Sequence, residues 1–132
     1  MPNIELADKW RDYAKTDFDV AVHDMTFSPV PIAIICYHCQ QAGEKALKAI
    51  LAYHDQEIPR THDLYRLLEL CQPLEPAIPD LTKQALELSN FAIAPRYPSV
   101  IELDEKDMNT ALSHANAILT AIADLWIKPG QE

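Results

Sequence analysis

Glycine is scarce in this chain: it accounts for only two of the 132 residues. Tight hairpins and phosphate-cradling loops depend on glycine, and neither a GxGxxG nor a GxxxxGK[ST] pattern occurs. Long apolar runs are also missing, because no stretch approaches the roughly 18–20 residues of a membrane span. The opening residues, MPNIELADKW, contain neither the basic nor the apolar segment of a secretory signal peptide. These absences point away from a P-loop or dinucleotide-binding fold, a membrane protein and a secreted protein.

Positive charge is in short supply as well. Eleven Lys and Arg stand against 20 Asp and Glu, which gives a net charge of −9. This balance argues against a broadly basic, nonspecific nucleic-acid binder, but it leaves room for a local basic pocket on an acidic body. Three cysteines, an odd number without a secretory signal, fit a reducing cytoplasm better than a disulfide framework. We therefore expect a cytoplasmic protein.

What is present is helical periodicity. Ten prolines fall mostly in clusters between stretches whose apolar residues recur every three or four positions, the spacing of one helix face. Five helices are expected, at residues 3–25, 31–54, 61–71, 80–95 and 104–126, with Asn3, Thr61, Asp80 and Asp104 as candidate N-caps. The pattern predicts an all-α fold, an antiparallel up-and-down four-helix bundle with one additional short helix. The length fits one domain over residues 1–132.

The second expected helix contains CYHC, in which Cys36 and Cys39 form a CxxC. Redox pairs of this kind place a thiol at a helix N-terminus, and here both cysteines lie inside the helix. A structural zinc site needs four ligands, and the sequence contains no second CxxC or HxxxH to complete one. We therefore interpret both cysteines as core residues and expect no metal.

The other side of the same helix is polar. His38, Gln41, Lys45 and Lys48 follow one another at steps of three and four residues, with Glu44 beside them. One interpretation is a ligand-binding face. The alternative is a solvated face with one intrahelical ion pair between Glu44 and Lys48.

Two further segments carry candidate anion-binding groups. In RTHDLY, Arg60 precedes a helix start and His62 lies in the first turn, where backbone N–H groups can receive an anion. The alternative there is a helix cap with incidental charges. In PRYP, Arg96 and Tyr97 lie between two prolines, a rigid setting that suits phosphate recognition or stacking.

Asp17 interrupts the apolar face of the first helix. A carboxylate at such a position lies at a bundle end, in water, or beside a cation from a neighbouring helix. We expect a structural ion pair, with Lys45 and Arg96 as the candidate partners, and this pairing is also the alternative to a ligand-binding role for Arg96.

Four segments taken together resemble the HEPN domain, the higher-eukaryote and prokaryote nucleotide-binding domain. They are AKTDFDVA (14–21), CYHCQQAGEKALKAIL (36–51), IPRTHDL (58–64) and RYP (96–98), and they span nearly the whole chain. The resemblance implies a bundle of four to five helices, commonly a homodimer with a cleft at its interface. Many bacterial and archaeal relatives are encoded beside a minimal nucleotidyltransferase and act as its helical partner, often in toxin–antitoxin pairs. It also turns six separate groups into one candidate ligand-binding cluster: His38, Lys45, Arg60, His62, Arg96 and Tyr97.

The chain departs from the ribonuclease members of that family, which carry an arginine followed by four to six residues and a histidine. None of its four arginines has a histidine at that spacing, so the chain looks like the RYP-containing branch. No Ser/His/Asp order, paired carboxylates or HExxH stands out either, so we assign no catalytic residue and no cofactor. The prediction is a non-catalytic module that binds a nucleotide or another phosphate-bearing ligand and pairs with a minimal nucleotidyltransferase. Two alternatives stay open: a ribonuclease toxin that uses His38 or His62 as general base, and a ligand-free oligomerisation module.

Overall fold

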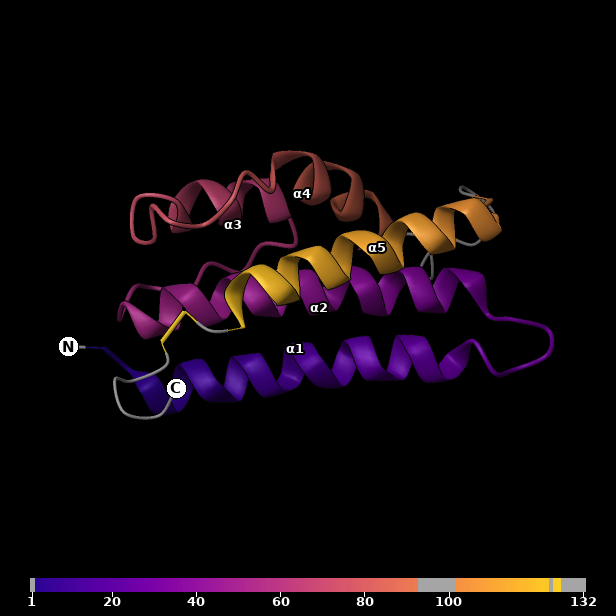
Figure 1. Ribbon diagram of the computed structural model, residues 1–132, viewed down its shortest axis with the longest axis horizontal. Coiled ribbons are helices and arrows are strands. Elements are labelled where there is room, and N and C mark those ends of the chain that lie inside the picture. The colour runs from indigo at the N-terminus through magenta and orange to yellow at the C-terminus, as the bar shows by residue number, and fades with distance from the viewer. Residues whose placement is uncertain (1, 93–101, 124, 127–132) are drawn as a thin grey trace.

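A computed structural model describes residues 2–92, 102–123 and 125–126 of the chain (Figure 1). Its helices are α1 (Ile4–Asp24), α2 (Ile32–Tyr53), α3 (Leu64–Cys71), α4 (Thr82–Ser89) and α5 (Glu105–Ile122), with a 3₁₀ turn, η1 (Asn90–Ala92), directly after α4. Over these described ranges there is no strand, so the predicted all-α bundle with an additional short helix is confirmed. Three helices are long, and α3 and α4 have eight residues each.

The helix starts follow the capping chemistry of the sequence, with two corrections. At α4 the N-cap is Leu81, which makes no side-chain cap, while Asp80, one residue earlier, accepts from the backbone N–H of Thr82 at 3.0 Å. Asn3 accepts a hydrogen bond from the backbone N–H of Leu6, and Asp104 forms a capping box with Asp107. Thr61, however, does not cap α3. The side chain of Asp63 accepts from the backbone N–H groups of Tyr65 and Arg66, while the Thr61 hydroxyl accepts from the N–H of Asp63. A carboxylate serves two orphan N–H groups at once, so α3 begins at Leu64, after Asp63.

Helix α2 is the central element of the fold. It contacts α1, α3, α4, η1 and α5, and most of its residues are buried. Figure 1 shows α1 along one side of α2 and running in the opposite direction, with α3 and α4 on the other side. Helix α5 crosses α2 and runs in the same direction as α2. A helix enclosed on several sides needs small residues, and α2 supplies alanine, cysteine and glycine along its buried faces.

Gly43 is a point of close approach between α2 and its neighbours. A Cβ atom at this position would lie 2.8 Å from Leu64 Cδ2, 2.9 Å from Leu88 Cδ2 and 3.3 Å from Ile118 Cδ1. These three side chains come from α3, α4 and α5, so three helices meet over one glycine. The absence of a side chain at residue 43 therefore allows the layers to pack this closely.

A tryptophan close to the C-terminus closes one end of the bundle. Trp126 stacks on Tyr53, with the ring centroids 5.0 Å apart, and its indole N–H donates to Asp8 at 3.0 Å. The guanidinium of Arg11 lies 4.5 Å from the Trp126 ring centroid and donates to the backbone carbonyl of Ala123. Segments from both ends of the chain and from the end of α2 are thereby joined.

Within the described residues, no helix has the length and apolar character needed to cross a bilayer.

Candidate functional site

The polar side of α2 begins with a cluster around Asp17. One carboxylate oxygen of Asp17, on α1, lies 2.5 Å from Lys45 Nζ, and the other lies 3.0 Å from His38 Nδ1. The carboxylate is mostly buried, whereas the side chains of Lys45 and His38 keep about a quarter of their surface exposed. Asp17 therefore positions two of the candidate ligand-binding groups and leaves donor positions on both of them unused.

A second cluster is centred on Glu44. Its carboxylate lies 2.9 Å from Lys48 Nζ and 2.7 Å from His62 Nδ1, and it accepts from Gln40 Nε2 at 3.3 Å. The side chains of Glu44 and Lys48 are only 5% and 9% exposed. The predicted intrahelical ion pair between Glu44 and Lys48 is therefore confirmed, but it is buried, and the expectation that it lies on a solvated face is wrong.

The burial of Glu44 comes from the connector, residues 54–63, which joins α2 to α3. Gln40 Nε2 donates to the backbone carbonyl of His62 at 3.0 Å, and the His62 ring lies against Glu44. The connector must therefore return along α2 to reach residues 40–44 before α3 begins. On the other flank, Lys48 Nζ lies 5.7 Å from the ring centroid of Trp10 on α1. The buried ion pair thus lies between α1 and the connector.

The two clusters lie along one polar face of α2, whose Lys48 end is buried. We name this face the α2 stripe: His38, Gln41, Lys45 and Lys48, which repeat at steps of three and four residues along one face of the helix. Asp17 approaches this stripe from α1. Glu44 and His62 approach it from the side of the connector, and Gln41 Nε2 donates to Gln40 Oε1 at 2.7 Å to link the two flanks.

Of the six predicted ligand-binding residues, four lie in the described part of the chain. His38 and Lys45 meet on Asp17, and His62 is bound to Glu44 with about half of its side chain exposed. Arg60 is exposed on the connector and forms no ion pair with any residue that the structure describes. Arg96 and Tyr97 lie outside the described residues, and so does the alternative pairing of Asp17 with Arg96.

We expect Asp17→Ala to lower the free energy of unfolding by about 2 kcal/mol, because it strands the half-buried ammonium group of Lys45. Chemical denaturation of the two proteins measures the difference. Asp19→Ala is the matched control on the same helix, since Asp19 pairs with Lys15 in the open, where such a pair contributes about 0–1 kcal/mol. Equal losses in the two variants would contradict a structural role for the Asp17 cluster.

The cysteines take no part in this site. Cys36 and Cys39 are fully buried core residues, as the sequence predicted, and Cys71 on α3 is a third free thiol buried in the same core, where it contacts the backbone carbonyl of Leu47. Burial raises the pKa of each thiol to about 12, with a smaller contribution from Asp107 at Cys36. Among the described residues, no group of three or more His, Cys, Asp or Glu side chains is arranged to hold a metal ion.

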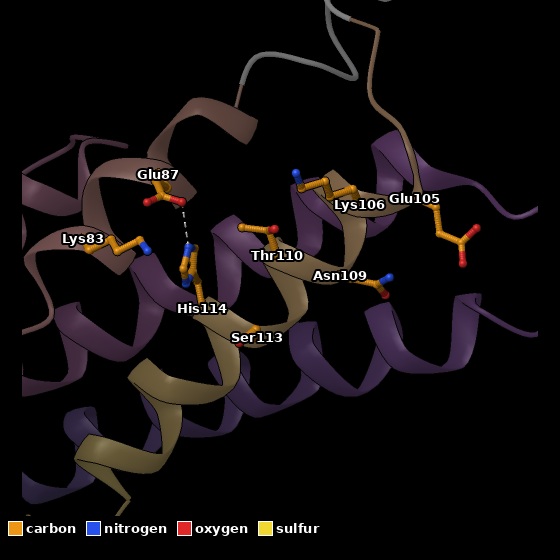
Figure 2. Close-up of a pocket in the computed structure, with 8 residues that line it drawn as sticks. All are labelled: Lys83, Glu87, Glu105, Lys106, Asn109, Thr110, Ser113 and His114. Carbon is orange, nitrogen blue, oxygen red and sulfur yellow. Dashed lines mark hydrogen bonds and ion pairs between the residues drawn. The ribbon is translucent and has the colours of Figure 1, made fainter.

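One polar groove was missed by the sequence reasoning. It lies between α4 and α5, has a volume of about 560 Å³, and appears in Figure 2. Its lining residues are Lys83, Glu87, Glu105, Lys106, Asn109, Thr110, Ser113 and His114. The sequence pattern that could have predicted this groove is the polar row of Lys106, Thr110 and His114, which lie at steps of four residues on one side of α5.

Comparisons with known proteins place the whole bundle in context. The sequence profile of the HEPN domain matches residues 7–125. The structure is similar to the crystal structure of TT1696 from Thermus thermophilus, with a TM-score of 0.77 and 24% identity over 91% of this chain and 98% of that one. It is also similar to ST0689, an archaeal HEPN homologue, with a TM-score of 0.68 and 23% identity over 90% of this chain and 96% of that one. No curated protein sequence matches the chain.

Proposed function

The chain belongs to the HEPN domain family, and on that basis we propose that it is a non-catalytic module that binds a nucleotide or another phosphate-bearing ligand. In this proposal the ligand lies against the α2 stripe and the exposed Arg60, and the module pairs with a minimal nucleotidyltransferase in a toxin–antitoxin-type system. The sharing of Asp17 by His38 and Lys45 is the observation that carries the ligand-binding part.

Asp17 engages only part of the donor capacity of its two partners. The Lys45 ammonium group has three N–H donors, and when Nδ1 of His38 faces Asp17 its Nε2 makes no hydrogen bond to a residue that the structure describes. Both side chains remain partly open to solvent. A phosphate oxygen could therefore bind Lys45 without breaking the ion pair that positions it. Arg60 adds a guanidinium group, whose planar set of donors suits phosphate.

We expect Arg60→Ala to weaken binding of the preferred ligand about tenfold, the effect of losing one charge-assisted contact at an exposed site. Calorimetric titration with ATP, GTP and short RNAs identifies the ligand and measures the change. Arg66→Ala is the matched control, because Arg66 is also exposed and lies on α3, close in sequence but outside the connector. Binding that is equally weakened by both substitutions, or by neither, would contradict the assignment of Arg60.

The pairing with a nucleotidyltransferase is supported by the surface at the α1–α2 turn. Met25, Phe27, Val30 and Ile34 are exposed there, at 39%, 54%, 39% and 47% of their surface. Several large apolar side chains near one another on the surface of a protein mark a contact site for another protein. We propose the identity of the partner, and a homodimer of the chain itself, on the basis of the family resemblance.

An adjacent gene for a small nucleotidyltransferase, and a complex of the two proteins that survives size-exclusion chromatography, are the results that this proposal requires. Light scattering on the chain alone measures whether it is a dimer. A chain that binds no such partner when the two are coexpressed would contradict the proposed pairing.

One observation favours RNA cleavage as a second candidate function. Asp17 Oδ1 lies 3.0 Å from His38 Nδ1, so the carboxylate fixes the imidazole and directs Nε2 away from it. A histidine held in this way can act as a general base. Growth arrest on expression of this chain alone, abolished by His38→Ala, would support cleavage over binding.

A further inference from the structure

The groove between α4 and α5 is built from facing polar rows. Lys83 and Glu87 lie four residues apart on α4, opposite Lys106, Thr110 and His114 on α5. Figure 2 shows Lys83 extending toward His114, with Lys106 beside Thr110 further along the groove. Glu105 and Asn109 lie at the far end, and the Glu105 carboxylate points away from the lysines. The two lysines therefore lie on the two sides of one hollow.

Two carboxylates line this groove, and only Glu87 is engaged by another lining residue, since Glu105 points away from the lysines. Glu87 Oε1 lies 3.1 Å from His114 Nε2. Asp104 and Asp107, at the start of α5, each accept a backbone N–H of the other in the capping box, at 2.8 and 3.0 Å. Within the described part of the chain, neither Lys83 nor Lys106 forms an ion pair. Two ammonium groups thus border one hollow without an ion pair to any residue that the structure describes, on a protein whose net charge is −9.

The groove also offers neutral donors. The hydroxyl groups of Thr110 and Ser113 line it, and neither makes a side-chain hydrogen bond to another residue that the structure describes. A volume of about 560 Å³ lies within the range of roughly 300–1,000 Å³ that small-molecule sites occupy. Two cations, with the hydroxyl groups of Thr110 and Ser113 in the same lining, match a phosphate monoester, which carries a charge of about −1.5 to −2 at pH 7.

We propose that the α4–α5 groove is a second binding site, which takes the phosphate group of a small phosphorylated ligand between Lys83 and Lys106. Thr110 and Ser113 donate hydrogen bonds to the phosphate oxygens. None of the groove residues belongs to the α2 stripe or to the connector, so this site can be tested independently of the one proposed above.

Inorganic phosphate and phenyl phosphate, titrated into ¹⁵N-labelled protein at low ionic strength, test the site. We expect saturable shifts of amide signals in α4 and in the first half of α5. Lys83→Ala and Lys106→Ala should each weaken binding about tenfold, and the double variant should abolish saturation. Lys9→Ala is the matched control, since Lys9 is exposed on α1, and it should leave the titration unchanged.

Glu87→Gln provides a second test, because it should change the affinity for phosphate only if the lysines bind the phosphate directly. Removing the one acidic group between the lysines should tighten phosphate binding about threefold or more, because a like charge close to the bound phosphate is lost. The proposal is overturned if phosphate shifts no signals in α4 and α5. It is equally overturned if the lysine variants bind as the unchanged protein does, or if Glu87→Gln weakens binding. Arg60→Ala should have no effect on this titration, which separates the failure of one site from the failure of the other.

Discussion

Glu44→Ala is expected to lower the free energy of unfolding by about 3–5 kcal/mol, the cost of leaving one partner of a buried ion pair without its counter-charge. Lys48 would keep its ammonium group in a position where only 9% of the side chain is exposed. His62 and Gln40 would lose the acceptor that holds the connector against α2. Urea denaturation followed by circular dichroism measures the loss.

A double variant separates the ion pair from simple packing. Glu44→Leu combined with Lys48→Met replaces both charges with apolar groups of similar volume, a change that is often neutral or stabilising in a buried setting. We expect it to recover most of the stability that Glu44→Ala loses. If the double variant is as unstable as Glu44→Ala, the stranded charge is not the cause of the loss, and the connector contact with His62 is.

Trp126→Ala should cost about 3–5 kcal/mol, the range observed when a buried tryptophan or phenylalanine is truncated. Trp126 is 7% exposed and stacks on Tyr53, and the substitution also removes the acceptor surface for Arg11 and the donor for Asp8. Thermal unfolding, checked for reversibility, measures the change. The loss should be accompanied by faster hydrogen exchange at the start of α1 and at the end of α2.

Trp126→Phe is the control for this site. It keeps a ring against Tyr53 but removes the indole N–H that donates to Asp8, so only about 1 kcal/mol should be lost. A phenylalanine variant as unstable as the alanine variant would mean that the hydrogen bond, and not the stacked ring, secures this end of the bundle.

The helices themselves could be read from local patterns. Asn3 and Asp104 lie where the structure places N-caps, and the apolar spacing of α2 and α5 matches their buried faces. On α1 the match is partial, because alanines are buried while Leu6, Tyr13 and Val20 are exposed. The start of α3 was misplaced because Thr61 and Asp63 are both good capping residues. The local sequence cannot decide whether Thr61 or Asp63 caps α3, because the path of the connector determines which backbone N–H groups need a partner.

The site was less predictable, because burial on the polar side of α2 is decided by segments distant in sequence. Glu44 and Lys48 have the spacing of a surface ion pair, and only the return of the connector and the approach of Trp10 enclose them. The α4–α5 groove poses the same difficulty. Lys83 and Lys106 come together only because two helices, separated in the chain by more than a dozen residues, pack side by side.

The three buried thiols have a practical consequence for anyone handling this protein. Alkylating reagents attack the thiolate, and a pKa of about 12 keeps Cys36, Cys39 and Cys71 protonated in the folded chain at neutral pH. Labelling by iodoacetamide must therefore wait for the structure to open. Mass spectrometry of the modified peptides would report opening of α2 through Cys36 and Cys39, and opening of α3 through Cys71.

The same three thiols also limit the stability of the folded chain at alkaline pH. In the unfolded chain a thiol loses its proton near pH 9, whereas in the folded chain it keeps the proton until about pH 12. The unfolded chain therefore binds fewer protons within this window, and stability falls as the pH rises through it. Below pH 9 the thiols remain protonated in both states and the contribution is fully present. Replacing the three cysteines with alanine or serine should reduce the loss of stability between pH 9 and pH 12, although it opens small voids in the core. The buried cysteines therefore make this bundle sensitive to base without any disulfide or metal being involved.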